Sequence, residues 1–598
     1  SAVQIANTTA AFLLSGLFVH GDDVTIDRGI QLVNVSSGAV ESCRVDNMNT
    51  GVGVQSSSGV WIARNALVNT ACLISASRDV IVEDNDCFSV SLDVGHSQEV
   101  SVTRNQVNTT LSVWGRGSMT VTVWDSDSCR VLDNTLWTAS DTGSWESNLR
   151  IYGSLNCTIH GNVMNELGIY INGERDHYAT VEIGQDNTAR MLPVDFRKNA
   201  DDVTVDRTGF GQLIIANCTE VRLQDLSISG IGCPVDLVFC SDVDVSDCTF
   251  ADMGTALRVT SSSDVRIRHN TFVNESEVWL DECEDLDFSD NDLTSGSYGS
   301  LYAGSLRNST IEDNRFAVES AETYLYGSLN VTVRNNVFSR GGLRLEGHAV
   351  AEYDSHIIDT SNLVVGKPIL YLKREAEREV DMSNHSQVIL ANCTGMDLHG
   401  MTTSSSWAIQ MGFSKDVAVH SCRIYGYNPI DLHYADSITF YENDFVNPVA
   451  LMQLTMTHNV TTYHCNIMGE YGAWSAGGFD GYEPTNILWD NGYPDGGNYW
   501  EGYYWDDDNY SGSNQDIPGS DGICDRAKDV AWGMDRYPLV SPYVHDQWVD
   551  PEDAWQDAAL WLSAIAAIAL ASAGVSYLLF VREPPAKKPP EAGRAGEP

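Results

Sequence analysis

Basic side chains are scarce in this sequence. Lysine and arginine together number 35, against 82 aspartates and glutamates, so the formal net charge is −47 at pH 7. A chain of this charge repels polyanions, which excludes nucleic acid as the expected partner. The acidity does not indicate disorder, because 43% of the residues are apolar and 15 are tryptophan, enough for a sizeable core.

Compact motifs for catalysis and metal binding are also missing. The sequence has no Cys-x-x-Cys pair, P-loop, nucleophile elbow or dinucleotide-binding glycine fingerprint. It has no tract rich in His or Met, so copper binding is not supported. An acidic group does recur, as Asp22, Asp23 and Asp27 and again as Asp201, Asp202 and Asp206. Repetition favours turn formers over a catalytic pair, which is needed once, so no catalytic residue is predicted.

What the sequence has in abundance is one short repeat. In "SSSDVRIRHNTFVN" (261–274), Val265 and Ile267 precede Asn270, and Phe272 follows it. The same frame recurs every 20 to 23 residues within each run. Its asparagines are Asn65, Asn85, Asn105, Asn270, Asn291, Asn314, Asn336 and Asn443. Such a period indicates a solenoid.

The alternation of apolar and polar residues predicts strands, and a repeat of this length suits a three-sided coil of short strands. Leucine-rich repeats have a similar period, but their leucine spacing is absent. The sequence therefore predicts an all-β, right-handed parallel β-helix of roughly twenty coils about 4.8 Å apart. We expect the repeated asparagines to occupy bends in the left-handed conformation and to join their amides in a structural ladder.

A longer repeat divides the chain into three modules. "NADDVTVDRTGFGQLIIANCTEVRLQD" resembles the segment that begins at His20, and "SQVILANCTGMDLHG" matches its second half 175 residues later. Modules two and three each open with a segment that leaves the frame, where we expect a protruding strand pair. The predicted boundaries are modules at 1–176, 177–352 and 353–485, a cap rich in Trp, Asp and Gly at 486–545, an acidic linker at 546–557, a membrane helix at 558–580 and a tail at 581–598.

Residues 558–580 form an uncharged apolar run of 23 residues, long enough to span a bilayer. Acidic residues precede it and basic residues follow it, which predicts a single-pass membrane protein with its N-terminal part outside the cell and a cytoplasmic tail. The alternative is a buried core helix. The chain begins at Ser1 without an apolar leader, as expected of a mature form whose signal peptide has been removed.

Glycosylation sequons are frequent in the part predicted to lie outside. Asn-x-Ser/Thr occurs at Asn7, Asn34, Asn108, Asn156, Asn217, Asn274, Asn308, Asn330, Asn384, Asn392, Asn459 and Asn509. Some of these are expected to carry glycans. A chain this rich in Asn, Ser and Thr also generates several sequons by chance.

Most of the 14 cysteines fall into columns of the repeat. Cys129 with Cys157, and Cys218 with Cys240, occupy one column in successive coils. Neighbouring coils bring equivalent Cα atoms within disulfide range, and an oxidising exterior favours bridging, so both pairs are disulfide candidates. The alternative is that they are buried thiols packed as small apolar residues.

The segment 486–543 loses the coil period and is rich in Gly, Trp, Tyr and Asp. An open β-helix end exposes unpaired strand edges, so capping is the expected role. Its aspartates also have the oxygen ligands that calcium prefers, which makes calcium a candidate cofactor. The candidate ligands are Asp506, Asp507, Asp508, Asp516, Asp521 and Asp525.

Within this segment, "GNYWEGYY", "DGICD" and "DRYPLVSPY" resemble the C-terminal signature of archaeal surface proteins related to the NosD-type periplasmic copper-binding β-helix family. "DTSNLVVGKPILYLK" with "VILANCT" resembles the inter-module segment of that group. The resemblance covers roughly residues 20–543 and implies a right-handed β-helix, of a type found in carbohydrate-binding proteins and sugar hydrolases, at the cell surface. The family's Asp-Gly-Asp-Gly-Ile-Gly-Asp run reads "GSDGICD" here, with Ser520 and Cys524 intruding.

Two classes of function follow. The first is a membrane-anchored, glycosylated surface protein without enzymatic activity: a surface-layer component, an adhesin or a carbohydrate-binding stalk. Its partners would be surface glycans, other envelope proteins or further copies of itself. The second is a tethered polysaccharide lyase or glycoside hydrolase. A carboxylate cluster present in one module only, beside Tyr and Trp side chains, would favour the enzyme.

Overall fold

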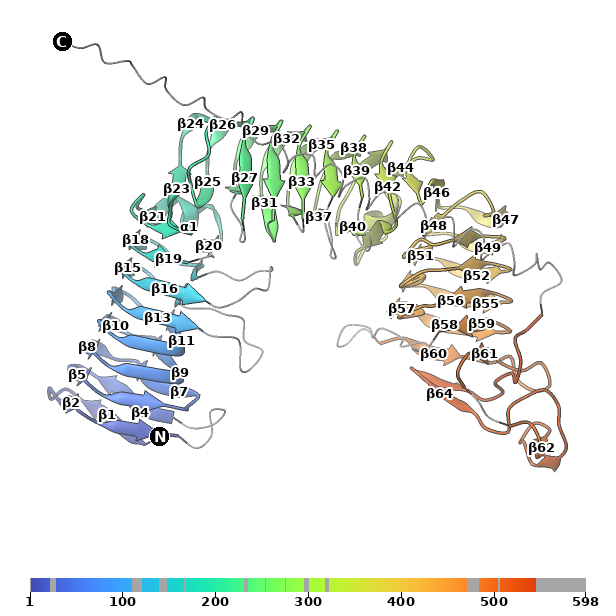
Figure 1. Cartoon of the computed structure of the whole chain (residues 1–598), viewed down its shortest axis with the longest axis horizontal. Helices are drawn as coiled ribbons and strands as arrows, with labels where there is room; N and C mark the ends of the chain where they lie inside the picture. Colours follow the sequence, from blue (N-terminus) through green and yellow to red (C-terminus); the bar gives the residue numbers. More distant parts are fainter. Residues whose placement is uncertain are drawn as a thin grey trace, which may run out of the picture. The chain divides into compact units, whose positions relative to one another are not determined.

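Each sequence repeat forms one coil of three short strands, and successive coils pair in parallel to build a right-handed β-helix (Figure 1). The computed structural model describes residues 2–21, 28–109, 121–138, 148–165, 168–230, 235–252, 254–274, 276–294, 301–317, 322–469, 483–503 and 506–544. The three sides of each coil are called faces a, b and c below. The all-β parallel β-helix predicted from the repeat is thus the observed fold.

The first run of coils extends to about residue 190. Its face a contains β1 (Val3–Thr8), β4 (Arg28–Val35), β7 (Thr50–Gln55), β9 (Ala66–Ser75), β11 (Asp86–Gly95), β14 (Val121–Trp124), β17 (Leu149–Tyr152) and β20 (Ile169–Asn172). Face b contains β2 (Leu13–Ser15), β5 (Gly38–Glu41), β8 (Ser58–Ala63), β10 (Arg78–Glu83), β12 (Ser101–Thr103), β15 (Arg130–Leu132), β18 (Thr158–His160) and β21 (Glu182–Ile183). Face c contains β3 (Phe18–His20), β6 (Arg44–Asp46), the first halves of β9 and β11, β13 (Gln106–Thr109), β16 (Thr135–Thr138), β19 (Val163–Met164) and β22 (Thr188–Ala189).

The second run follows the same plan. Its face a contains β23 (Leu192–Lys198), β25 (Gln212–Ala216), β28 (Val235–Val238), β31 (Thr255–Thr260), β34 (Glu277–Asp281), β37 (Leu301–Gly304), β40 (Glu322–Tyr326) and β43 (Gly342–Glu346). Face b contains β24 (Asp201–Val205), β26 (Thr219–Gln224), β29 (Ser241–Ser246), β32 (Ser263–Arg268), β35 (Glu284–Ser289), β38 (Thr310–Glu312), β41 (Thr332–Arg334) and β44 (Ile357–Ile358). Face c contains β27 (Ser227–Ser229), β30 (Thr249–Ala251), β33 (Thr271–Val273), β36 (Asp292–Thr294), β39 (Arg315–Phe316), β42 (Val337–Phe338) and β45 (Leu363–Val364).

The third run is shorter. Its face a contains β46 (Lys367–Lys373), β48 (Gln387–Ala391), β51 (Ile409–Gly412), β54 (Ile430–His433) and β57 (Met452–Thr455). Face b contains β47 (Ala376–Asp381), β49 (Thr394–His399), β52 (Lys415–His420), β55 (Asp436–Tyr441), β58 (His458–Tyr463) and β60 (Thr485–Leu488). Face c contains β50 (Thr402–Thr403), β53 (Arg423–Ile424), β56 (Asp444–Val446), β59 (Asn466–Met468) and β61 (Tyr499–Trp500). Since β60 and β61 still pair with coil strands, coil structure extends past the predicted boundary at residue 485.

The interior is filled by columns of identical or similar side chains, because in-register pairing places equivalent residues above one another. Val82 lies between Ile62 and Val102, and all three are at most 1% exposed. Phe250 and Phe272 stack with ring centroids 4.9 Å apart. Every buried residue therefore contacts its counterparts as well as its own coil, which explains why the apolar frame is kept so strictly.

The repeated asparagines lie in files along the coils. Asn85 Nδ2 donates to Asn105 Oδ1 (2.9 Å) and to the Ile62 carbonyl (3.0 Å), while its Oδ1 accepts from Asn65 N (2.9 Å). Equivalent bonds join Asn270, Asn291, Asn314 and Asn336, and Asn443 contacts Cys465. The files also contain residues that the frame did not identify: Asn134, Asn162, Asn187, Asn362 and Asn498.

The expectation that these asparagines are left-handed is wrong. The residue with positive φ is the one before each of them, for example Arg64 (φ 54°), Asp84 (φ 53°) and Arg104 (φ 55°). The preceding residue makes the bend, and this turns the asparagine side chain inward, where it satisfies buried backbone groups. A second, unpredicted file is built from serine: Ser57 N donates to Ser77 Oγ, and Ser77 N to Ser97 Oγ, each at 3.1 Å.

Two junctions separate the three runs, and both use the same parts. At the first, α1 (Arg175–Thr180) is followed by an antiparallel hairpin of β22 and β23; at the second, α2 (Ala351–Asp354) is followed by a hairpin of β45 and β46. Each hairpin turn has two residues with positive φ, Arg190 with Met191 and Val365 with Gly366, as a type I′ turn requires. The hairpin carries the chain from face c of one run to face a of the next.

At each junction, the side-chain amide of a buried glutamine forms the hydrogen bonds that a neighbouring strand would otherwise form. Gln212 Oε1 accepts from Ile169 N (2.8 Å) and its Nε2 donates to Ile169 O (2.7 Å). Gln387, 175 residues later, makes the same pair of bonds with Leu343 (3.2 and 2.7 Å). The last strand of each preceding run thereby keeps its backbone groups satisfied where the next coil is missing.

The segment after the last coil is held by aspartates and contains the short hairpins β62 (Tyr510–Ser511) with β63 (Ile517–Pro518) and β64 (Lys528–Val530) with β65 (Gly533–Asp535). Asp535 is fully buried and accepts from Asn498 N (2.8 Å), the end of an asparagine file, and from Trp500 Nε1 (2.9 Å). The β-helix and this segment form one unit, Ser1–Tyr543.

The predicted linker at 546–557, membrane helix at 558–580 and tail at 581–598 lie outside the described residues. Among the residues that the structure describes, neither helix has the length or apolar character that a membrane span requires.

Candidate functional site

Face a of the second run carries a file of aromatic side chains. Leu280, Ala303 and Leu325 point into the core, so their neighbours on each strand point outward. Trp279, Tyr302 and Tyr324 are consecutive in register, half-buried on the outer side. The Trp279 and Tyr302 rings stack with centroids 3.6 Å apart, and Tyr324 follows at 5.5 Å.

A second file runs beside the first and is acidic at both ends. It consists of Asp281, Gly304, Tyr326 and Glu346. A Cβ at Gly304 would lie 2.5 Å from Asp281 Oδ1 and 2.7 Å from the Tyr302 ring, so only glycine leaves room for both side chains. Burial, with a smaller effect from Glu282, raises the pKa of Asp281; burial, with Asp281 next, raises the pKa of Tyr302 to about 12.

The aromatic file ends at Arg344, which joins the second and third runs. Its Nε donates to Asp431 Oδ2 (3.0 Å), and its Nη2 lies 3.2 Å from Glu346 Oε2. The guanidinium also lies over the ring of Trp407, at 4.4 Å. His433 Nε2 is 2.9 Å from Asp431 Oδ1. Arg344, Glu346, Asp431 and His433 are called the Arg344 cluster below.

The Arg344 cluster is buried, with side chains at most 11% exposed. Burial alone would raise the pKa of Asp431, but the charges and hydrogen bonds of Arg344 and His433 lower it to about 2. The Tyr324 hydroxyl donates to Glu346, and burial, with Glu346 next, raises the pKa of that tyrosine. Asp431 is therefore ionised at neutral pH, where it can stabilise positive charge but is unsuited to donating or accepting a proton.

Sequence reasoning missed the Arg344 cluster because its members come from different modules. Arg344 and Asp431 are 87 residues apart, and no spacing within one repeat relates them. The first junction has only a smaller analogue: Arg258 Nε donates to Asp236 Oδ1 (2.8 Å), and the guanidinium lies 4.3 Å from the ring of Tyr170.

The structure does not gather the six C-terminal aspartates into a metal site. Asp507 accepts from Asp521 N (3.0 Å) and Gly522 N (2.7 Å), and Asp525 accepts from Tyr510 N (3.1 Å). Their oxygens thus satisfy turn backbone. Within the described ranges, no three Asp, Glu, His or Cys side chains lie close enough to hold a metal ion, which includes Asp506, Asp508, Asp516 and Asp521.

The four cysteines of the predicted disulfides are buried free thiols in the structure. They do stack in adjacent coils, but each thiol donates to a carbonyl two residues earlier: Cys129 to Asp127 O (3.7 Å), Cys157 to Leu155 O (3.5 Å), Cys218 to Ala216 O (3.3 Å) and Cys240 to Val238 O (3.5 Å). With free thiols they pack as small apolar residues, and the two disulfides stay predictions.

Most sequon asparagines lie at exposed turns, and Asn108 and Asn217 are partly buried. Those with positive φ are Asn7, Asn34, Asn156, Asn217, Asn274, Asn308, Asn330, Asn392 and Asn459; Asn384 and Asn509 are also exposed. Some join in outer files, as where Asn34 Nδ2 donates to Asn7 Oδ1 (2.8 Å). Turn geometry is thus a sufficient reason for asparagine at these positions, because it tolerates the left-handed region.

Comparisons with known proteins support the fold. Residues 211–368 match the family model described as a right handed beta helix region. Curated protein sequences contain no match to the chain. Among solved structures, PfbA, a surface adhesin of Streptococcus pneumoniae, is 8% identical with a TM-score of 0.14, covering 73% of this chain and 85% of PfbA. The A-module of the Azotobacter vinelandii mannuronan C-5 epimerase AlgE6 is 9% identical with a TM-score of 0.08, covering 78% and 91%. At these TM-scores neither similarity supports a functional argument.

Proposed function

We propose that the chain is a glycan-binding protein of the cell surface, an adhesin or carbohydrate-binding stalk whose binding surface is face a of the second run. The observation that carries the proposal is the file of Trp279, Tyr302 and Tyr324 beside Asp281 and Glu346. Aromatic side chains provide apolar contact to the C–H faces of sugars, and carboxylates accept hydrogen bonds from hydroxyl groups. Polysaccharides are extended polymers, and a file along the coils offers one contact per coil.

The location of the protein belongs to the same proposal. A bilayer anchor at 558–580, a short cytoplasmic tail and glycans at exposed sequons would place the β-helix outside the cell, where polysaccharide ligands occur. The outward sequon positions are compatible with glycans that avoid the core. Other envelope proteins and further copies of the chain are the additional partners expected of such a stalk.

The test is a glycan array probed with the full-length chain in detergent. The double variant Trp279→Ala with Tyr302→Ala should lose at least tenfold in apparent affinity for the glycans that the wild type retains. Trp137→Ala is the matched control, because Trp137 is a 43% exposed tryptophan on face c of the first run. If no glycan is retained by the wild type, or if the double variant and the control bind equally well, the proposal is wrong.

A second candidate, a polysaccharide lyase or glycoside hydrolase, is favoured by one observation: among the described residues the Arg344 cluster occurs once, and it adjoins Tyr324. The assay is release of new reducing ends or unsaturated sugars from a polysaccharide panel. An enzyme would lose activity in Glu346→Gln and Tyr324→Phe while circular dichroism remained unchanged. If the wild type releases neither product from any polysaccharide that it binds, binding alone is the function.

A further inference from the structure

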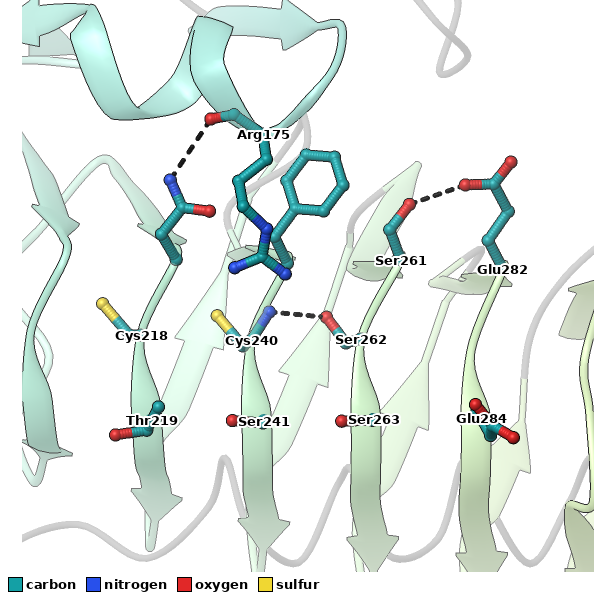
Figure 2. A pocket seen from close by; sticks show the side chains of 12 residues that line it. Arg175, Cys218, Thr219, Cys240, Ser241, Ser261, Ser262, Ser263, Glu282 and Glu284 are labelled. Carbon is teal, nitrogen blue, oxygen red and sulfur yellow. Dashed lines mark hydrogen bonds between the residues drawn. The ribbon is translucent and has the colours of Figure 1, made fainter.

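A separate cleft of about 310 Å³ opens beside the first junction, at the turns between faces a and b (Figure 2). Its rim contains Arg175 from α1, and its floor contains the first residues of consecutive face b strands. Figure 2 shows these strands side by side, with Arg175 above them. The cleft uses none of the residues of the face a site.

The floor of the cleft contains three hydroxyl groups and one carboxylate at regular intervals. Thr219, Ser241, Ser263 and Glu284 are paired in register, one per coil, about 4.8 Å apart. The Thr219 hydroxyl donates to Asp201 Oδ1 (2.5 Å). Those of Ser241 and Ser263 have no hydrogen-bond partner in the part of the chain that the structure describes. Two hydroxyls in one cleft are therefore available to a ligand.

The charged groups of the cleft are one guanidinium and two carboxylates. The Arg175 guanidinium lies over the Phe239 ring at 5.3 Å and forms no ion pair with any described residue, although the chain has 82 acidic side chains. Glu282 accepts from the Ser261 hydroxyl (2.6 Å), and Glu284 from Asn308 Nδ2 (3.4 Å). The cleft thus combines one charged hydrogen-bond donor, Arg175, with two carboxylate acceptors and the apolar ring of Phe239. The charged side chains of the cleft sum to a net negative charge.

The second junction shows that this cleft is not a by-product of the junction itself. The structural parts are shared: Tyr178 packs on Phe239 as Tyr353 packs on Phe413, both at 5.6 Å. The cleft positions differ: Val350, Lys415 and Tyr434 replace Arg175, Ser241 and Ser261.

The replacing side chains have neighbours of their own at the second junction. Tyr434 stacks on Phe413, with centroids 4.6 Å apart and planes at 3°, and Lys415 Nζ lies 3.8 Å from Asp436 Oδ2. The junction scaffold therefore accommodates different side chains at these positions, and of the two described junctions only the first combines Arg175, Ser241 and Ser261.

We propose that the cleft is a second saccharide site, which binds one terminal or branching unit of a neutral glycan. Vicinal hydroxyls of a sugar can accept hydrogen bonds from Arg175 and donate to Glu282 and Glu284, while Ser241 and Ser263 serve either role. A neutral sugar fits better than a uronate, because two carboxylates oppose one guanidinium on a chain of net charge −47. The shallow, polar setting predicts a millimolar dissociation constant for a single sugar.

The experiment is saturation-transfer NMR of the full-length chain in detergent. The probes are methyl β-D-glucopyranoside, methyl α-D-mannopyranoside and methyl β-D-galactopyranoside, with glucuronic acid and glucosamine as charged comparisons. At least one neutral glycoside should bind saturably. Arg175→Met should weaken it at least tenfold, and Ser241→Lys, which introduces the residue found at the second junction, should abolish it. The matched control Arg266→Met alters an exposed arginine of the same run outside the cleft and should bind as the wild type does.

Three results would overturn the proposal: no neutral glycoside binds the wild type, only a charged sugar binds, or binding survives both Arg175→Met and Ser241→Lys. The face a variant Trp279→Ala with Tyr302→Ala separates the two sites. If that variant loses the glycoside while Arg175→Met keeps it, the cleft proposal is wrong and the face a proposal stands. If only Arg175→Met loses it, the cleft binds sugar whatever the array shows for face a.

Discussion

Removal of one ladder asparagine should cost several kcal/mol, although it leaves the apolar core intact. Asn85 is 1% exposed and its amide makes four hydrogen bonds. In Asn85→Ala, the backbone N–H of Asn65 and the carbonyl of Ile62 each lose a buried partner. The Ile62 carbonyl keeps its ladder partner on β10, so only the Asn65 N–H is left unpaired. An unpaired buried group costs about 1–3 kcal/mol and each of the other lost hydrogen bonds about 0.5–1.5 kcal/mol, so the expected loss is about 4 kcal/mol. Asn65 Nδ2 and Asn105 Oδ1 retain other partners, which limits the damage to the adjoining coils.

The assay is urea unfolding followed by circular dichroism, with Asn172→Ala as the matched control. Asn172 is an exposed asparagine at the end of β20 whose Nδ2 donates only to Tyr170 Oη (3.1 Å), and its loss should cost less than about 1 kcal/mol. Asn85→Cys should fall between the two, since Cys465 occupies the same file position between Asn443 and Asn498. If Asn85→Ala destabilises the chain no more than Asn172→Ala does, the ladder does not hold the coils together.

The remaining predictions concern the junctions, the cap and the two candidate sites. Gln387→Leu should leave the N–H of Leu343 unpaired, while the Leu343 carbonyl keeps its bond from Gln410 Nε2, so the loss should be about 1–3 kcal/mol with increased proteolysis near α2. Burial raises the pKa of Asp535 from 3.8 to about 7. The protonated carboxyl therefore contributes its full stabilisation of the folded state below pH 3.8, and this stabilisation is lost as the pH rises through about 7. The total loss in the free energy of unfolding is on the order of 4 kcal/mol. The protection factors of the amides in residues 506–537, which correct for the intrinsic base-catalysed exchange rate, should therefore be lower at pH 8 than at pH 5, and Asp535→Asn should remove this difference. The double variant Trp279→Ala with Tyr302→Ala should remove sugar binding at the face a site only. Arg175→Met should remove sugar binding at the cleft only.

The repeat predicts the core and the asparagine file but not the bend that orients it. The inward positions are restricted to apolar residues and asparagine, so they form a visible pattern. The bend before each asparagine is occupied by Arg64, Asp84 and Arg104 in successive coils, because the left-handed turn selects a backbone conformation and leaves the exposed side chain free to vary. The residue types at this position therefore do not reveal the left-handed bend.

Longer coils also hide members of the file. Asn105 bonds to Asn134 across 29 residues and Asn134 to Asn162 across 28, against 20 for Asn65 to Asn85. The extra residues change the spacing without disturbing the pairing of the described strands, since β13 still pairs with β16 and β14 with β17. A fixed period thus detects the uniform coils and loses those with long turns.

The candidate sites could not be predicted from the repeat because their residues do not recur. A repeated residue such as Gln212 or Gln387 solves a structural problem that recurs at each junction, and its partner is a backbone group found in both. Arg344 and Arg175 solve no recurring problem: the positions equivalent to Arg175 and Ser241 hold Val350 and Lys415. In a solenoid, then, the residues that depart from their own column are the ones to test for binding. Gln212→Leu should lower the yield of folded protein but leave the sugar specificity of the folded fraction unchanged. Arg175→Met should leave folding unchanged and weaken sugar binding at the cleft.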